Sequence, residues 1–285
     1  MKILITGANG MLGNYIAKKL NKNKIYASSN SSNLFNYANF LNFDLSIDDY
    51  KDLFSWIKPD LVIHCAAITD VNFCESNPKK SYLINFLSIR KLFKIYKDTF
   101  FIFISSDAVF NGSKKFPKED DLRKPLNNYG IQKKEAEDFI ISNFKKFTII
   151  RTTPIGININ RNNLLTWFIK RMNNHEKINL YSNIFFTPID LYNLTEALNF
   201  IIENQIYGIY HIVSNDRISK YDFCFQLSAY LNFNKNLLVN SNYTHDKILA
   251  LRSLDQSMDN SKFNNLFNNK LPNLQDVIKN IITDL

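Results

Sequence analysis

The stretch Thr6-Gly7-Ala8-Asn9-Gly10-Met11-Leu12-Gly13 decides the fold of this chain. It lies directly between an apolar run at Lys2–Thr6 and a segment with helical spacing of its apolar residues at Met11–Leu20. Three of the seven glycines of the chain fall within its first thirteen residues, so this segment has a backbone requirement of its own. A strand, a glycine-rich turn and a helix in this order are typical of a loop that binds phosphate groups at the start of a helix.

Each glycine of this loop has its own expected task. Gly7 permits the tight turn, Gly10 lets the backbone approach a pyrophosphate, and Gly13 allows the helix to pack closely on the sheet. The loop therefore predicts a dinucleotide cofactor site, with a purely structural turn as the alternative. The other loop residues expected to line that site are Asn9, Met11 and Leu12.

The end of the second apolar run indicates which dinucleotide binds. An acidic residue there often holds the ribose 2′-hydroxyl of NAD. Here Ala27-Ser28-Ser29-Asn30 offers neither a carboxylate to repel a 2′-phosphate nor an arginine to bind it. We expect Ser28 beside the ribose, a mild preference for NADP(H), and acceptance of NAD(H). Asp44-Leu45 is placed to face the adenine, although a helix cap ahead of Asp48–Ile57 explains Asp44 equally well.

The first half of the chain alternates short apolar runs with longer amphipathic segments. This alternation predicts an α/β fold, a Rossmann-type doubly wound parallel sheet with right-handed crossovers. The expected strands are Lys2–Thr6, Lys24–Ala27, Asp60–Ala66, Phe100–Ser106 and Phe147–Arg151, and the expected helices are Met11–Leu20, Asp48–Ile57, Pro78–Tyr96 and Tyr129–Asn143.

The pattern becomes irregular after Pro154. We expect residues 1–155 and 188–214 to form the dinucleotide-binding domain. Residues 156–187 and 215–285 are expected to form a small C-terminal substrate-binding lid. The further elements predicted by periodicity are helices at Asn163–Met172, Leu191–Glu203, Lys220–Leu231 and Leu274–Thr283, and a strand at Gly208–Val213.

Three side chains form the candidate catalytic group. Tyr129 and Lys133 are four residues apart at the start of a helix, so they share one face. A tyrosine titrates near a pH of about 10 in water, and a neighbouring ammonium group lowers that pKa. Lys133 is also expected to hold the nicotinamide ribose. Ser106 ends a central strand, where such sheets bind ligands, and its hydroxyl can orient a substrate carbonyl towards Tyr129 as the proton donor.

With these motifs in this order, the chain resembles the extended short-chain dehydrogenases. Among them it is most similar to the dTDP-4-dehydrorhamnose reductase branch of sugar-nucleotide enzymes, and the resemblance covers nearly the whole chain. The matching positions are Gly7–Gly13, His64-Cys65-Ala66-Ala67, Val71, Glu75, Asn85, Ser105–Phe110, Gly112, Pro125, Tyr129–Lys133, Arg151-Thr152 and the segment from Arg252 to Lys262-Phe263.

The resemblance implies roles for residues that spacing alone leaves open. Ala66 and Ala67 would line the cofactor, and Asn85 would fix the active-site helix or a water relay. Arg252 would bind the diphosphate of the substrate, a task that suits its fork of donors, with an ordinary surface arginine as the alternative. The substrate-contacting residues would be Ser106, Asp107 and Arg252.

Three further positions qualify the resemblance. His64 lies within an expected strand and is interpreted as a core histidine rather than as a base. Ala108 stands where the branch usually has an aromatic residue, and Pro154 stands where it has a tryptophan near the sugar. Both departures would enlarge or reshape the hexose pocket. The resemblance therefore predicts the reaction of this chain more securely than its substrate.

Composition limits the class of partner. The net charge of +9 favours an anionic partner, but lysine, asparagine, isoleucine and phenylalanine are enriched throughout and no basic block stands out. Three separated cysteines, Cys65, Cys74 and Cys224, indicate neither a disulfide framework nor a metal site. No apolar run is long enough to span a bilayer, and no leader pattern is present. We expect a cytoplasmic protein that binds no nucleic acid and no membrane, and a homodimer is compatible with the sequence.

These features predict an NAD(P)H-dependent reductase of a nucleotide-activated 4-keto-6-deoxy sugar, in surface-polysaccharide precursor synthesis. One alternative is a sugar-nucleotide 4-epimerase or 4,6-dehydratase with retained NAD. Dehydratases of this kind resemble the chain around Ser106-Asp107 but carry a glutamate where Ala108 stands. The other alternative is a non-catalytic regulatory subunit on the same fold, as in methionine adenosyltransferase. A binding module has no need of the Ser106, Tyr129 and Lys133 group.

Overall fold

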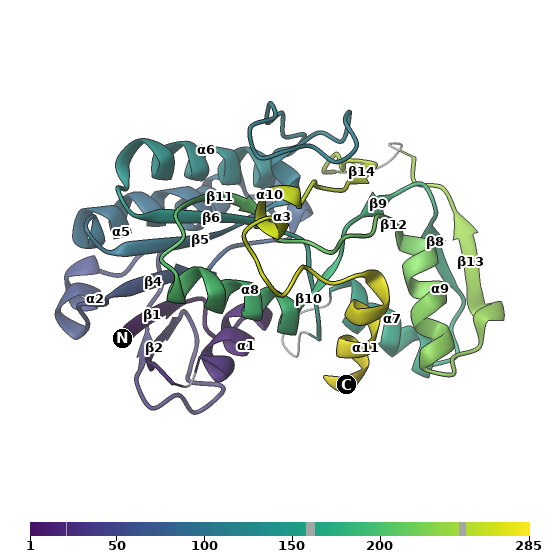
Figure 1. Cartoon of the computed structure of the whole chain (residues 1–285), viewed down its shortest axis with the longest axis horizontal. Coiled ribbons are helices and arrows are strands. Elements are labelled where there is room, and N and C mark those ends of the chain that lie inside the picture. The colour runs from purple at the N-terminus through teal and green to yellow at the C-terminus, as the bar shows by residue number, and fades with distance from the viewer. Residues whose placement is uncertain (21, 158–162, 245–248) are drawn as a thin grey trace.

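Figure 1 shows the computed structural model, which describes residues 1–20, 22–157, 163–244 and 249–285. A central sheet of seven strands, all paired in parallel, carries helices on both faces. In spatial order the strands are β11 (Gly208–His211), β6 (Phe147–Thr152), β5 (Phe100–Ser106), β4 (Leu61–His64), β1 (Lys2–Thr6), β2 (Lys24–Ser29) and β3 (Phe40–Asn42).

The strand order confirms the predicted doubly wound α/β fold. From β1 the chain builds outward through β2 and β3, and it then returns to the other side of β1 to add β4, β5, β6 and β11. The order therefore reverses between β1 and β4. In sheets of this kind the loops at the carboxyl ends of the strands leave a crevice at such a reversal, where ligands bind.

Two layers of helices bury the two faces of the sheet (Figure 1). On one face Ile3, Ile102 and Ile150 pack with α1 (Met11–Lys19) and α8 (Leu191–Glu203). On the other face the intervening strand residues, such as Phe101, pack with α2 (Tyr50–Trp56), α5 (Ser88–Tyr96) and α6 (Asn128–Asn143). Alternate residues of one strand thus serve opposite cores, which is why these strands read as continuous apolar runs.

The helical stretch predicted over Pro78–Tyr96 has an interruption. It consists of α4 (Pro78–Tyr82), a π-helical turn at Leu83–Leu87 and α5. The sequence analysis also leaves out α3 (Val71–Ser76) and the edge strand β3. Such π turns are rare and are often found at functional sites, and this one contains Asn85.

Beyond the sheet, a smaller group of elements has an apolar cluster of its own, in the part of the chain for which a C-terminal lid is predicted (Figure 1). It contains α7 (Leu164–Asn173), α9 (Lys220–Tyr230), α11 (Leu274–Thr283) and the parallel pair β8 (Ile178–Tyr181) and β13 (Leu238–Ser241). Residues 158–162 and 245–248 of the expected lid lie outside the described residues. The remaining short elements are β7 (Pro154–Ile155), β9 (Phe185–Phe186), β10 (Ile189–Asp190), β12 (Ile218–Ser219), β14 (Asp255–Gln256), α10 (Ser261–Asn264) and the 3₁₀ turns Asp107–Val109 and Lys235–Leu237.

Not every late segment packs within the lid cluster. Phe263, Phe267 and Leu271 belong to the apolar core on the α1 and α8 face of the main sheet. Within the described part of the chain, no helix is long and apolar enough to cross a membrane.

Candidate active site

A cleft of about 1230 Å³ opens along the carboxyl edge of the sheet, between the sheet and the smaller C-terminal group of elements. All the residues that the sequence analysis selects for cofactor, catalysis and substrate line this cleft. These residues are Gly7, Asn9, Gly10, Met11, Leu12, Gly13, Ser28, Asp44, Leu45, Ala66, Ala67, Ser106, Asp107, Tyr129, Lys133 and Arg252.

The glycine loop leaves the floor of the cleft without side chains. Gly7 has a φ of +69°, and a Cβ atom there would lie 2.7 Å from the Cα atom of Ala66. A Cβ atom at Gly13 would overlap the carbonyl oxygen of Gly7. Larger residues at either position would push α1 away from the sheet or block the turn. The loop therefore brings bare backbone and the N-terminus of α1 to the cleft, as a pyrophosphate requires.

The loop is fastened to the chain that follows β2. Asn9 Nδ2 donates to Ser31 Oγ and to the carbonyl oxygen of Ser32, both at 2.8 Å. Ser28 lines the cleft but is only 1 % exposed, and its carbonyl oxygen accepts from the Ala8 N–H at 3.0 Å. The exposed Asn30 lines the cleft two residues later. The sequence analysis includes Asn30 in this stretch but places Ser28 beside the ribose, and it misses Ser31, because β2 continues two residues past its predicted end, to Ser29.

The helix-cap interpretation of Asp44 is wrong, although its side chain has a local structural role. Asp44 Oδ1 accepts from the Ser46 N–H at 2.8 Å, so the side chain does stabilise a local turn. The cap of α2 is a different residue, Asp49, whose carboxylate accepts from the Lys51 N–H. Asp44 and Leu45 both line the cleft, at the end where the sequence places the adenine.

Ser106 and Tyr129 meet in the middle of the cleft. Ser106 ends β5 and is 8 % exposed, as is Tyr129 in the first turn of α6. Burial raises the pKa of Tyr129 above its ordinary value, while the hydrogen bond with the Ser106 hydroxyl lowers it. Ser106 Oγ also donates to Asp107 Oδ1 at 2.8 Å. At neutral pH Tyr129 is therefore a protonated phenol with a second hydroxyl beside it.

Lys133 is buried one helical turn beyond Tyr129. Its Nζ atom donates to the Ile104 carbonyl oxygen at 2.8 Å and lies 4.4 Å from the centre of the Phe103 ring. Burial lowers the pKa of Lys133 to about 8, and Glu137 acts in the opposite direction. The expectation that Lys133 lowers the pKa of Tyr129 is not met, because burial of the phenol dominates and the net shift is upward. Lys133 and Tyr129 nevertheless line the same cleft.

Backbone packing fixes Tyr129 relative to Ser106. Asn127 caps α6 by accepting from the Gly130 N–H, and a Cβ atom at Gly130 would overlap the carbonyl oxygen of Ala108. The absence of a side chain at Gly130 thus lets α6 begin directly against the turn that follows Ser106. This close approach explains why the Tyr129–Lys133 motif contains a glycine.

Asn85 joins the π-helical turn to the active-site helix. Asn85 Oδ1 accepts from the Ile68 N–H at 2.8 Å, and Nδ2 donates to Gln132 Oε1 at 2.8 Å. Gln132 lies between Tyr129 and Lys133, and Ile68 lines the cleft. Asn85 therefore holds α6 in place by direct hydrogen bonds, one of the two expected tasks. Glu75 supports the same helix, because its carboxylate accepts from the backbone and side chain of Asn128.

His64 is a core residue, as the sequence analysis expects. Its ring lies near Phe101 and Phe103, and its Nδ1 atom is 2.8 Å from Thr6 Oγ1. Burial lowers the pKa of His64 to about 3, so it stays neutral at physiological pH.

Arg151 forms a second buried group behind the carboxyl end of β5. Arg151 Nη2 is 2.8 Å from Glu137 Oε2, and Ser105 Oγ donates to Glu137 Oε1 at 2.5 Å. Both charged side chains are fully buried. These contacts tie the carboxyl ends of β5 and β6 to α6, and so support the position of Ser106 from behind.

Two cationic side chains from the C-terminal part of the chain, Arg252 and Lys220, line the other end of the cleft. Arg252 is exposed and lines the cleft, where the resemblance expects it. Lys220, the first residue of α9, lines the cleft too and escaped sequence reasoning, because a lysine at the start of an expected helix carries no motif. Asp107 lies within electrostatic range of Lys220, and burial raises the pKa of its carboxyl group.

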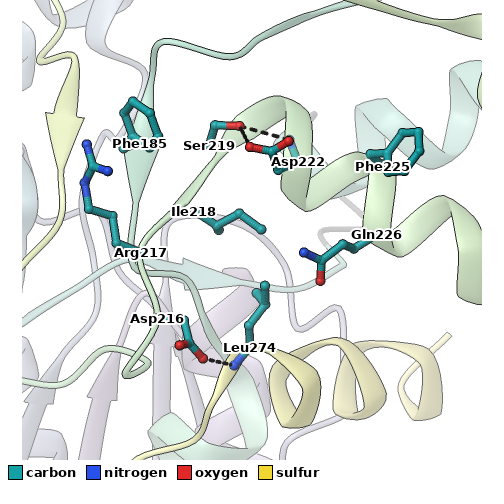
Figure 2. A pocket seen from close by; sticks show the side chains of 9 residues that line it. All are labelled: Phe185, Asp216, Arg217, Ile218, Ser219, Asp222, Phe225, Gln226 and Leu274. Atoms are coloured by element: carbon teal, nitrogen blue, oxygen red, sulfur yellow. Dashed lines mark hydrogen bonds between the residues drawn. The ribbon is translucent and has the colours of Figure 1, made fainter.

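A separate, shallower hollow of about 390 Å³ lies on the lid and is not part of this site (Figure 2). Its charged groups already have partners within the protein. Arg217 binds Asp255 at 2.7 Å, Asp216 accepts from the Leu274 N–H, and Asp222 accepts from the Ser219 hydroxyl. Across the described residues no cluster of histidine, cysteine, aspartate and glutamate has the geometry to hold a metal ion.

Comparison with known proteins places the chain in a family. The family model for the RmlD substrate-binding domain matches residues 1–285. The spore coat polysaccharide biosynthesis protein SpsK of Bacillus subtilis is 29% identical over 227 residues, which is 78% of this chain and 76% of that protein. The dTDP-4-dehydrorhamnose reductase of Aggregatibacter actinomycetemcomitans is 29% identical over 235 residues, with coverage of 78% and 76%.

Relatives of another kind match as well. The methionine adenosyltransferase 2 subunit beta of Xenopus tropicalis is 28% identical over 237 residues, 78% of this chain and 69% of that protein. Among solved structures, the dTDP-4-dehydrorhamnose reductase of Bacillus anthracis in complex with NADP superposes with a TM-score of 0.89 at 22% identity, covering 100% of this chain and 99% of that one. The relatives by sequence therefore include a protein named as a reductase and one named as a subunit.

Proposed function

The chain belongs to the RmlD substrate-binding domain family, and from that premise we propose that it is an NAD(P)H-dependent reductase of a nucleotide-activated 4-keto-6-deoxy sugar. The observation that carries the proposal is the meeting of Ser106, Tyr129 and Lys133 in the same cleft as the glycine loop. A serine, a tyrosine and a lysine beside a dinucleotide site are the parts that carbonyl reduction needs.

NADP(H) is the proposed cofactor, with NAD(H) also accepted. The side-chain-free floor at Gly7 and Gly13 suits a pyrophosphate. At the ribose end, Ser28, Asn30 and Ser31 line the cleft, and none of them carries a charge that would repel a 2′-phosphate. The NADP named with the Bacillus anthracis reductase agrees with this assignment.

A reduced nicotinamide bound in the cleft would supply the hydride that the carbonyl carbon needs. Tyr129 donates its phenolic proton to the carbonyl oxygen, and its raised pKa keeps that proton in place until the substrate arrives. The Ser106 hydroxyl, which donates to Asp107 Oδ1 in this structure, can donate to the same carbonyl oxygen instead. Lys133 lies one turn further along the cleft, where its ammonium group can bind the ribose hydroxyls.

The substrate proposal rests on the family and on the lid end of the cleft. Relatives named for dTDP-4-dehydrorhamnose reduction and for spore coat polysaccharide biosynthesis support a sugar-nucleotide substrate and a role in surface-polysaccharide precursor synthesis. Ser106 and Asp107 would contact the sugar, and Arg252 the diphosphate. We further propose that residues 1–155 and 188–214 bind the cofactor and that residues 156–187 and 215–285 bind the substrate.

The chain is proposed to work in the cytoplasm, which is consistent with three unpaired cysteines, and without nucleic acid or membrane partners. A homodimer is compatible with this proposal. The methionine adenosyltransferase relatives favour a regulatory subunit as the second candidate function.

A panel of nucleotide 4-keto sugars, assayed for NADPH and NADH oxidation, tests the proposal. Turnover with one member supports a reductase. If no sugar of the panel is reduced and the protein instead changes the activity of a methionine adenosyltransferase, the second candidate holds. Tightly bound NAD in the purified protein, with no net cofactor consumption, would favour an epimerase.

A further inference from the structure

Lys220 occupies a position that local structure does not favour for a cation. It is the first residue of α9, an eleven-residue helix capped by Ser219, whose Oγ atom accepts from the Asp222 N–H at 3.0 Å. The helix dipole is positive at this end, so a lysine here is repelled by the helix that carries it. Residues that break a local rule of this kind tend to be found at functional sites.

The ammonium group of Lys220 is also poorly compensated by the protein. Its Nζ atom lies 3.2 Å from the centre of the Phe186 ring, and no hydrogen bond or ion pair joins it to another described residue. Burial lowers the pKa of Lys220 to about 8. Since this half-buried ammonium group lines the cleft and makes no hydrogen bond or ion pair with a described residue, it is available to a counter-charge that enters the cleft.

The charged groups around Lys220 favour the binding of an anion. Arg252 lies close enough to lower the pKa of Lys220, although like charges repel, and both side chains line the cleft. The carboxylate of Asp107 attracts Lys220 but accepts its hydrogen bond from Ser106 Oγ. Two cations, Lys220 and Arg252, therefore line the same cleft, an arrangement that suits a phosphate group.

We infer that Lys220 binds the phosphate that is linked to the sugar of the nucleotide-sugar substrate, an assignment that rests on the proposed function. The reacting sugar carbon must lie at Ser106 and Tyr129. Lys220 is within electrostatic range of Asp107, next to Ser106, whereas Arg252 is exposed at the mouth of the cleft. The inner phosphate then meets Lys220, and the outer phosphate, which carries the nucleoside, meets Arg252.

This division of tasks gives a test that needs no catalysis. Binding of dTDP, UDP and dTMP to the full chain is measured by calorimetry in the presence of NADPH, for the wild type, Lys220→Met and Lys220→Arg. A charge-assisted hydrogen bond is worth about 10- to 100-fold in affinity. Lys220→Met should weaken the better nucleoside diphosphate by that factor, and Lys220→Arg should retain most of the affinity.

The affinity for dTMP distinguishes the loss of a contact with the inner phosphate from a general effect of removing a positive charge. dTMP lacks the second phosphate, so its affinity should be the same in the wild type and in Lys220→Met. Lys235→Met is the matched control, because Lys235 is also half-buried against an aromatic ring, Phe225 at 4.5 Å, but lies outside the cleft. This control should bind every nucleotide as the wild type does. A thermal melt of Lys220→Met should show a Tm close to that of the wild type, since Lys220 is half-buried and makes no hydrogen bond or ion pair with a described residue.

The outcomes separate this inference from the function on which it rests. Equal nucleoside diphosphate affinities in the wild type and Lys220→Met would overturn the inference and leave the proposed function intact. An equal loss for dTMP would place Lys220 on the nucleoside-linked phosphate and would also overturn it. If the wild type binds neither dTDP nor UDP, the proposed function fails, and the inference fails with it.

Discussion

The buried lysine of the catalytic group should leave a measurable signature in the pH dependence of stability. Lys133 is 3 % exposed, and burial lowers its pKa from 10.5 to about 8. Below pH 8 the folded protein must keep this ammonium group buried, and that cost is relieved as the pH rises from 8 towards 10.5. The unfolded chain binds more protons throughout that window, so Lys133 makes the protein more stable as the pH increases.

The size of the effect follows from the two pKa values. A difference of about 2.5 pH units corresponds to about 3 kcal/mol in full, and the part relieved between pH 7 and pH 10 is about 2.5 kcal/mol. Lys133→Met has no charge to bury, so it should lack this increment. Loss of the hydrogen bond to the Ile104 carbonyl oxygen should cost about 1 kcal/mol at every pH.

Urea unfolding at pH 7, 8, 9 and 10 measures both effects. The stability of the wild type relative to Lys133→Met should rise by about 2.5 kcal/mol between pH 7 and pH 10. Subtracting the variant removes the contribution of buried tyrosines such as Tyr50, whose pKa is raised and whose ionisation destabilises the fold at high pH. A wild-type advantage that stays constant with pH would mean that Lys133 is solvated, and would refute its place in the active site.

Four further substitutions test individual roles. Tyr129→Phe should reduce turnover by about 10²- to 10⁴-fold, the usual effect of losing a positioned acid, and leave the Kd of NADPH nearly unchanged; near-normal turnover would remove Tyr129 from the mechanism. Arg252→Ala should raise the KM of the sugar nucleotide well above any change in the KM of the cofactor, and equal changes in both would count against a substrate role. Asn30 is exposed in the cleft, so Asn30→Asp should repel a 2′-phosphate and shift the kcat/KM ratio of the two cofactors towards NADH. Ser28→Asp should shift the ratio in the same direction. Because Ser28 is buried, this second substitution should also lower the Tm. An unaltered cofactor ratio in both variants would place the ribose elsewhere.

The sequence predicts best where a segment is long and its ends are marked chemically. Phe100–Ser106 and Lys2–Thr6 form strands with the predicted bounds, since each is a continuous apolar run buried on both faces. Leu191–Glu203 also has its predicted bounds, because Asp190 caps the helix. The positions selected for the site line one cleft for a related reason, since parallel strands bring their carboxyl ends to one edge.

The features that sequence analysis misses depend on contacts between distant segments. The two-residue strands β9 and β14 pair across about seventy positions of the chain, and no periodicity marks them. The π turn around Asn85 depends on partners at Ile68 and Gln132. Lys220 is visible as a site residue only once the fold brings α9 to the cleft, beside Arg252.

The stoichiometry of cofactor consumption tests the central claim most directly. With dTDP-4-keto-6-deoxyglucose, or the corresponding UDP sugar, the protein should oxidise one NADPH for each 4-hydroxy-6-deoxy sugar formed. It should remove no water from a plain nucleotide hexose, because Ala108, directly after Asp107, has no proton to give or take. Formation of a 4-keto-6-deoxy product from the plain nucleotide hexose, without net cofactor change, would contradict the assignment as a reductase.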